Sequence, residues 1–275
     1  MNRLESKTIE HHGITTSYYD EGQGPILLLL HGFTGSKLDF HDQLQWFTDS
    51  YRVLVPDIRG HGESTNTEDE NGYSLALLVD DLASFIETLG LRDIHLLGHS
   101  MGGMVVIRYA LAHPEKLASL MLMDTSSAPL TMPQGMREMF RSTVANEGVS
   151  GLIKLMRSAP ASDEVQNGID FLGEEEHWAR VEEKLGQMDL LAYKKLGIEL
   201  GTSDDITASL SEICCPTTIM VGQADMPFVK SSHAMAEMIS ISELKVIEKA
   251  AHCPQYENAD AWREVVSNHL RKTSS

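Results

Sequence analysis

A serine between two glycines stands at the centre of the stretch IHLLGHSMGGMVVIRYA, residues 94–110. The apolar run Ile94–Leu97 is typical of a buried strand, and the residues after the motif repeat apolar side chains at helical spacing. Gly98 and Gly102 remove the side chains that would collide where a strand turns sharply into a helix. Such a turn can hold Ser100 in a strained backbone geometry, with its hydroxyl exposed at the end of the strand. The pattern predicts that Ser100 is a nucleophile.

A serine hydroxyl is a weak nucleophile at neutral pH and needs a base. The chain has twelve histidines, and His252 is the one that follows the last predicted strand, in a loop that can reach over the edge of the sheet. Seven others are expected to be solvated side chains: His11, His12, His41, His113, His177, His233 and His269. Three more are expected to have structural roles or positions. His31 and His61 are expected to fix turns by hydrogen bonding, and His95 to lie inside a strand. His99 is expected to point away from Ser100. We therefore predict that His252 is the base.

The base in turn needs an acid that accepts its second N–H, fixes its tautomer and stabilises the imidazolium. Asp225 follows the predicted strand Thr217–Val221 closely and precedes Met226-Pro227, which is a helix-entry signal. Asp124, at the end of another predicted strand, is the competitor, and its alternative role is to cap the following turn. We favour Asp225 as the acid.

The elements that must position these residues alternate along the chain. Apolar runs predict strands and helical periodicity predicts helices between them, after a polar opening (Thr8–Tyr19) that is expected to form an antiparallel edge pair. The predicted strands are Ile26–Leu30, Arg52–Pro56, Ile94–Leu97, Leu117–Met123, Thr217–Val221 and Leu244–Ile247, and the first clear helix is Tyr73–Leu89. This order indicates an α/β fold, with a mostly parallel sheet covered by helices on both faces. Sites of such sheets form at the carboxyl ends of the strands.

One long segment, residues 126–213, interrupts the alternation without a clear strand. Its helical segments are expected at Pro133–Val144, Ser150–Met156, Glu174–Gln187 and Leu190–Leu196. We predict a core formed by residues 1–125 and 214–275, with residues 126–213 inserted as a helical lid. The insertion contains Met132, Met136, Met139, Met156, Met188, Phe140 and Trp178. These side chains either pack onto the core or give an adaptable apolar lining to a substrate pocket, because methionine fits irregular ligands.

The composition of the chain restricts the classes of partner, the location and the cofactors that we expect. The formal net charge of −18 disfavours nucleic acids, anionic membranes and strongly anionic substrates. The N-terminal residues lack the apolar run of a signal peptide, so a cytoplasmic location is the default expectation. Three cysteines, Cys214, Cys215 and Cys253, are expected to be buried reduced thiols. We expect no metal or other cofactor, because the sequence lacks convincing metal-ligand spacing and a phosphate-binding loop. The sequence leaves the oligomeric state open.

Four sets of residues together resemble the α/β-hydrolase fold superfamily, in the branch of small carboxylesterases, lactonases and meta-cleavage-product hydrolases. They span residues 27–257, in the order this superfamily uses. The motifs are LLLLHGFTGS (Leu27–Ser36), DIRGHGES (Asp57–Ser64), GHSMGG (Gly98–Gly103), and VGQAD (Val221–Asp225) with AAHCPQYE (Ala250–Glu257). The chain order Ser100, Asp225, His252 also matches the nucleophile, acid and base of this fold.

The resemblance also supplies an oxyanion hole, which needs two N–H groups aimed at one point. Met101, directly after the nucleophile, is expected to offer one backbone N–H, and the resemblance assigns the other to the backbone of Phe33. The leading function is then hydrolysis of a small or medium, mainly uncharged carboxylic ester or lactone through an acyl-enzyme.

Three other functions stay open. The first is a C–C bond hydrolase of the meta-cleavage type, with the same triad. The second is a lyase like the menaquinone-pathway synthase, although that relative carries an arginine where this chain has Met104. The third is a ligand receptor of this fold. A lid with 8 Lys/Arg against 15 Asp/Glu favours neutral substrates. A preference for anions would first implicate Arg137, Arg141 and Arg157.

Overall fold

A single eight-stranded sheet forms the centre of the computed structural model, which describes residues 4–69, 71–130, 134–158 and 163–273. The strand order is β1-β2-β4-β3-β5-β6-β7-β8. β2 is antiparallel to β1 and β4, and all other pairs are parallel. The strands are β1 (Lys7–His11), β2 (Ile14–Glu21), β3 (Ile26–Leu30), β4 (Arg52–Pro56), β5 (Ile94–His99), β6 (Leu117–Met123), β7 (Thr217–Gly222) and β8 (Ser242–Ile247). The mostly parallel sheet with an antiparallel edge pair is confirmed.

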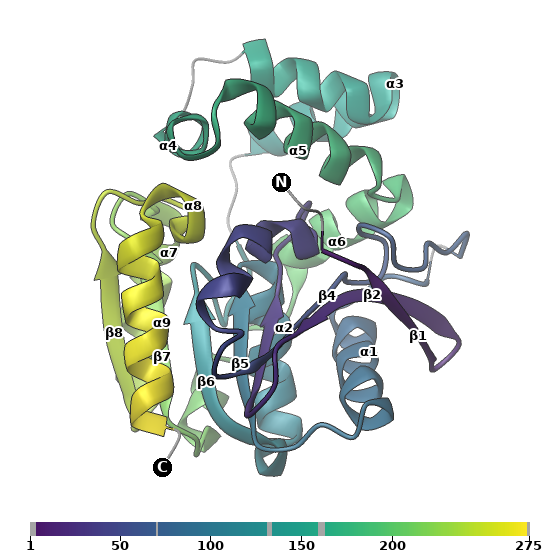
Figure 1. Cartoon of the computed structure of the whole chain (residues 1–275). Helices are drawn as coiled ribbons and strands as arrows, with labels where there is room; N and C mark the ends of the chain where they lie inside the picture. The colour runs from purple at the N-terminus through teal and green to yellow at the C-terminus, as the bar shows by residue number, and fades with distance from the viewer. Residues whose placement is uncertain (1–3, 70, 131–133, 159–162, 274–275) are drawn as a thin grey trace.

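The central strands are apolar on both faces because both faces are covered. In β3, Leu28 and Leu30 pack into one buried cluster, whereas Leu27 and Leu29 pack into another. The first cluster includes side chains of α1 (Leu75–Thr88), α2 (Met101–Ala112) and α7 (Met226–Met238). The second includes side chains of α9 (Ala259–Thr273) and of the 3₁₀ segment η1 (Lys37–Trp46). Figure 1 shows α1 and α9 well apart, with strands of the sheet between them. Continuous apolar strands are what a parallel sheet between two helical layers requires.

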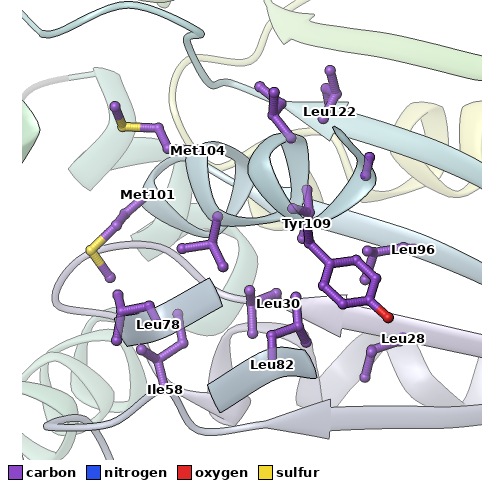
Figure 2. Close-up of a cluster of buried hydrophobic side chains, with 14 of the residues drawn as sticks. Leu28, Leu30, Ile58, Leu78, Leu82, Leu96, Met101, Met104, Tyr109 and Leu122 are labelled. Carbon is purple, nitrogen blue, oxygen red and sulfur yellow. The ribbon is translucent and has the colours of Figure 1, made fainter. Parts of the chain in front are cut away.

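Helix α2 is held tightly between the sheet and α1, which fixes the turn that precedes it. Met101 and Met104 are fully buried at its start, and Leu78 and Leu82 of α1 lie in the same cluster. Figure 2 shows these side chains around α2, together with leucines from the strands. Truncating such side chains typically costs about 2–5 kcal/mol of unfolding free energy. The packing therefore resists movement of the turn.

A helical insertion separates β6 from β7. It comprises α3 (Gln134–Ser158), α4 (Asp163–Leu172), α5 (Glu174–Gly186) and α6 (Leu190–Thr202), and α3 to α5 lie at the top of the molecule in Figure 1. Gly148 has non-helical angles inside α3, so the expected break between two helices is present. The sequence did not predict α4.

The insertion is anchored to the core by polar contacts as well as by packing. Tyr73 donates its hydroxyl to Asp189, and the Leu75 N–H donates to Glu199 at 3.0 Å. Ala192 and Leu196 of α6 are fully buried in the core cluster. These contacts fix α6 beside the start of α1, so the base of the insertion is part of the folded core.

Some expectations about exposure are wrong. His11 and His269 are buried rather than solvated, because the hydroxyls of Thr16 and Thr218 bond to their rings at 2.8 Å. None of the three cysteines is in a disulfide, but none is fully buried either: Cys214 is exposed, and Cys215 and Cys253 are partly exposed. Within the described ranges, the structure contains no helix with the length and apolar character needed to cross a membrane.

Candidate active site

The strained turn that the sequence predicts is present at Ser100. Its φ of 52° and ψ of −119° lie in a region that non-glycine residues rarely adopt. A Cβ on Gly98 would lie 2.6 Å from the Gly102 carbonyl oxygen, and one on Gly102 would lie 2.4 Å from the His31 carbonyl oxygen. The glycines are therefore required by close backbone approach. A hydrogen bond from the Ser100 N–H to the Met123 carbonyl oxygen, at 2.9 Å, stabilises this strained turn.

His252 lies beside Ser100. Its Nε2 is 3.0 Å from Ser100 Oγ, and its ring stacks on Phe228 with a centroid distance of 4.9 Å. His99 Nε2 donates to the His252 carbonyl oxygen at 2.7 Å, so His99 holds the backbone of the histidine loop. Burial and the neighbouring His252 lower the pKa of His99 to about 3, which keeps its ring neutral. The sequence did not indicate this supporting role.

Asp225, rather than Asp124, bonds to His252. The His252 Nδ1–H donates to Asp225 Oδ2 at 2.8 Å, and the Asp225 side chain is only 7% exposed. With Nδ1 donating, Nε2 is left to accept the Ser100 proton. Asp124 is fully buried next to this pair, and its Oδ1 accepts the Gly222 N–H at 2.8 Å. The three side chains Ser100, His252 and Asp225 therefore form a continuous hydrogen-bond chain.

The loop that carries Phe33 lies against the serine. A Cβ on Gly32 would be 2.9 Å from Ser100 Cβ, which shows how closely the two backbones approach. Met101 is the first residue of α2, and the first amides of a helix have no partner within the helix. The Phe33 ring packs on Tyr193 of α6 at 5.2 Å between centroids. The N–H groups of Phe33 and Met101 thus come from the two segments that flank Ser100.

A cavity of about 380 Å³ lies between this site and the insertion. His252 and Phe33 line it from the core, and apolar side chains line it from the insertion, namely Phe140, Leu152, Met156, Val165, Leu172, Val181, Leu185 and Tyr193. Of the expected lid methionines, Met156 lines this cavity, Met188 is buried in the core, and Met139 is 42% exposed. Met132 and the side chain of Met136 lie outside the described residues. Branched aliphatic and aromatic side chains, more than methionines, form the apolar lining.

The charged side chains that line this cavity all have partners. Lys184 pairs with Asp39, which is almost fully buried, and Arg180 pairs with Asp42 and Glu176. Burial favours the neutral form of Asp39, but the charge and hydrogen bond of Lys184, together with His31 and His99, leave the pKa of this carboxyl below its usual value. The Glu257 carboxylate accepts the N–H groups of Ala251 and Cys253. These pairs leave little free charge for a charged substrate.

His177 also lines the cavity, which corrects the expectation that it is a solvated side chain. Burial lowers its pKa. A Cβ on Gly168 of α4 would lie 2.6 Å from His177 Nδ1, so a glycine is what lets α4 and α5 approach here.

Two further histidines fix the loops beside the site, as the sequence predicts. His31 Nε2 accepts the Ile58 N–H at 2.9 Å, while its Nδ1 donates to Gly32 at 2.8 Å. His61 Nδ1 donates to the Arg59 carbonyl oxygen at 3.1 Å. Burial lowers the pKa of His31 to about 4 and that of His61 to about 3. Burial also lowers the pKa of His269 to about 4.

These neutral histidines predict loss of stability in acid. Because their pKa values are lowered in the folded protein, the unfolded chain binds more protons between about pH 6.5 and the folded values. Stability is therefore full above about pH 6.5 and falls as the pH is lowered towards 4, by roughly 1 kcal/mol per histidine per pH unit. Urea unfolding at about pH 7 and 5.5 measures this. His269→Asn should reduce the slope, and a flat profile would contradict the account.

Asp124, Asp225 and His252 together could also be considered as ligands of a cation, since one possible ligand atom from each lies within 4.8 Å of the others. In this arrangement, however, the Nδ1–H of His252 points at Asp225, and the Nε2 of His252 faces Ser100. Both ring nitrogens of His252 are thus already engaged with protein groups.

Comparisons with known proteins agree with this geometry. The model of the family described as "alpha/beta hydrolase fold" matches residues 25–259. A thermophilic esterase from Thermogutta terrifontis superposes with a TM-score of 0.83 at 27% identity, covering 99% of this chain and 100% of that one. A pimeloyl-[acyl-carrier protein] methyl ester esterase of Aeromonas hydrophila is 29% identical over 90% of this chain and 96% of its own. A non-heme haloperoxidase of Rhodococcus erythropolis is also 29% identical, over 90% and 93%. Relatives of equal similarity thus carry different activities.

Proposed function

Because the chain belongs to the α/β-hydrolase fold family, we propose that it hydrolyses carboxylic esters or lactones of small to medium, mainly uncharged substrates through an acyl-enzyme. The observation that carries this proposal is the hydrogen-bond chain from Ser100 through His252 to Asp225, with distances of 3.0 and 2.8 Å, beside a largely apolar cavity. The similarity to two esterases supports the same reaction class.

In the first half of the reaction, Ser100 Oγ attacks the ester carbonyl carbon as its proton passes to His252 Nε2. The carbonyl oxygen gains the negative charge and accepts the N–H groups of Phe33 and Met101. Asp225 stabilises the imidazolium and keeps its orientation. When the tetrahedral intermediate collapses, the C–O bond to the alcohol breaks and His252 gives its proton to the leaving oxygen. The acyl group is then bonded to Ser100.

In the second half, His252 takes a proton from water, and the resulting nucleophile attacks the acyl carbon. The same N–H groups accept the oxyanion, and collapse releases the carboxylic acid as Ser100 regains its proton. In both halves of the reaction, His252 accepts and returns the proton.

The other candidate functions have less support in the structure. Met104, at the position of the synthase arginine, is fully buried in the core and offers no charge to a carboxylated substrate. A C–C bond hydrolase of the meta-cleavage type would have to bind a dienone diacid in a cavity whose lining charges are already paired. A receptor would differ by its lack of rapid turnover.

A second cavity bears on whether the substrate carries a charge, because basic side chains line it. It measures about 500 Å³, shares Phe33, Phe140 and Tyr193 with the first, and is also lined by Arg141, Lys194 and Lys195. Of the arginines suspected from sequence, Arg141 therefore lies at a cavity. Arg157 pairs with Glu182 and lies over Trp178 instead, and the side chain of Arg137 is outside the described residues.

We expect the neutral member of a matched substrate pair to react faster. p-Nitrophenyl hexanoate and the p-nitrophenyl half-ester of adipic acid have similar chain lengths and differ by a terminal carboxylate. Burying that carboxylate without a partner costs several kcal/mol, so kcat/KM should be at least about tenfold higher for the hexanoate.

The pair should be measured at low and high salt, with Arg141→Ala as the matched variant. The expected result is that this variant leaves the preference unchanged. A tenfold preference for the anionic ester, lost in Arg141→Ala, would overturn the proposal of mainly uncharged substrates. Absence of turnover on every ester and lactone tested would contradict the hydrolase proposal itself.

A further inference from the structure

Asp124 joins the segments that carry the serine and the acid. It follows β6 directly, and its backbone N–H donates to Met220 of β7 at 3.0 Å. The next residue, Thr125, donates its hydroxyl to the Ser100 carbonyl oxygen at 2.6 Å. Asp124 Oδ1 accepts the N–H of Gly222, whose carbonyl oxygen accepts the Asp225 N–H at 3.0 Å. The side chain therefore holds the turn from which Asp225 projects.

The second oxygen of Asp124 has no such partner. Asp124 is 0% exposed, and its Oδ2 has no hydrogen-bond partner among the described residues. Potential ligand atoms of Asp124, Asp225 and His252 all lie within 4.8 Å of one another. Ionising both of two buried carboxyls this close together has a high free-energy cost, because each negative charge destabilises the other.

The surroundings decide which of the two carboxyls holds the proton. Asp225 already accepts the Nδ1–H of His252 at 2.8 Å, so it is placed as the acceptor of the pair. Burial, followed by the charge of Asp225, raises the pKa of Asp124 well above its ordinary value; the side-chain interaction with Asp225 and the charge of Glu257 act in the same direction, and the Gly222 N–H opposes them. The ionisable groups that act on Asp124 are thus Asp225 and Glu257, and His252 lies close to the two aspartates.

We propose that Asp124 keeps a proton on Oδ2 and directs it at Asp225, so that the two carboxyls share one negative charge that resides on Asp225. Asp124 is then a positioning residue: it acts through Asp225 rather than on the substrate. Its two oxygens have separate tasks, since Oδ1 accepts from the acid-bearing turn and the Oδ2–H orients the acid. The positioning role rests on the proposed hydrolase function, whereas the shared proton does not.

The proton on Asp124 can be detected by NMR, without any measurement of enzyme activity. In protein labelled with ¹³C at the aspartate side-chain carboxyls, we expect the Asp124 resonance to keep the shift of a protonated acid at about pH 8, far above the ordinary aspartate pKa of about 3.9. Loss of that resonance in Asp124→Asn assigns it, and Asp124→Ser provides a second assignment if the first variant does not fold.

Asp57→Asn is the control for this spectrum, because Asp57 is also buried and burial raises its pKa, although Lys37 pairs with it at 2.6 Å. The protonated resonance of Asp124 should persist in this control. If no resonance at about pH 8 is assigned to protonated Asp124, the shared proton is disproved, whatever the enzyme hydrolyses.

Kinetics test the positioning role. Asp124→Asn keeps a neutral side chain with one acceptor and one donor, so we expect kcat/KM within about threefold of wild type and an unchanged acid limb of the pH profile. Asp124→Ala removes the donor to Asp225, leaves that carboxylate more basic, and should move the limb to higher pH while kcat falls about tenfold or more.

The contrary results are distinct. If Asp124 were ionised, Asp124→Asn would remove a negative charge near His252 and move the acid limb to lower pH by about half a unit or more. If Asp124 only stabilised the fold, Asp124→Ala would lower the unfolding midpoint but leave the acid limb in place. Either result overturns the inference. A zinc requirement, seen as loss of activity with EDTA and recovery with added Zn²⁺, would replace the proton by a metal ion and also overturn it.

Discussion

Ser100→Ala should reduce kcat by about a million-fold, the loss seen when the nucleophile of a complete triad is removed. Ser100 is the residue that makes and breaks the covalent bond in the proposed mechanism, and His252 cannot activate a methyl group. The fold should survive, because the turn is held by the backbone bond from Ser100 to Met123 and by the glycines around it. Steady-state hydrolysis of a p-nitrophenyl ester and circular dichroism measure the two expectations.

Cys253→Ser is the matched control, since Cys253 lines the same cavity and is the alternative nucleophile nearest in sequence to the base. It should keep kcat within about threefold. If folded Ser100→Ala retained more than about a thousandth of wild-type activity, and Cys253→Ser lost most of it, the nucleophile would have been misassigned.

Asp225→Asn should lower kcat by about ten-thousand-fold, because an amide at this position favours the wrong histidine tautomer. The side-chain N–H of the asparagine would donate to His252 Nδ1, where the wild-type carboxylate accepts. His252 Nε2 would then carry the ring proton and could no longer accept the proton of Ser100. The substrate KM should change far less than kcat, since Asp225 is nearly buried behind the ring of His252 and does not line the cavity. Pre-steady-state kinetics with an activated ester separates the two parameters.

Asp124→Asn is the natural comparison, because it makes the same chemical change on the adjacent strand end. It should cost little activity. A reversal of the two effects would assign the acid to the end of β6 and contradict the hydrogen bond seen between Asp225 and His252.

The sequence predicted the framework well where one physical signal dominated. Ile26–Leu30, Arg52–Pro56 and Leu117–Met123 agree with β3, β4 and β6 to the residue, because these strands are apolar runs buried on both faces. The predicted nucleophile, base and acid also lie together in the structure. Their positions follow from strand ends, and parallel strands bring their carboxyl ends to one edge. Their catalytic roles stay predictions.

Other features depend on contacts that the sequence does not show. Helix α4 contains Asn167-Gly168, a helix-weakening pair, and it forms where Gly168 allows close packing against His177. His11 of β1 and His269 of α9 can be buried because hydroxyls of Thr16 in β2 and Thr218 in β7 bond to their rings. Asp124 and Asp225 were treated as rivals for one role, yet β6 and β7 are neighbours and place both carboxyls in one buried cluster. Each of these outcomes depends on tertiary neighbours rather than on local pattern.

The central claim is that an acyl group is transferred to Ser100, and trapping that intermediate tests it most directly. The protein should be mixed with p-nitrophenyl acetate, quenched in acid within the first turnover, digested and analysed by mass spectrometry. The account predicts one acetyl group per chain on the peptide that contains Ser100, formed in Asp225→Asn far more slowly than in the wild type. Rapid release of p-nitrophenol with no acetyl group on Ser100, or with the acetyl group on another residue such as Cys253, would contradict it.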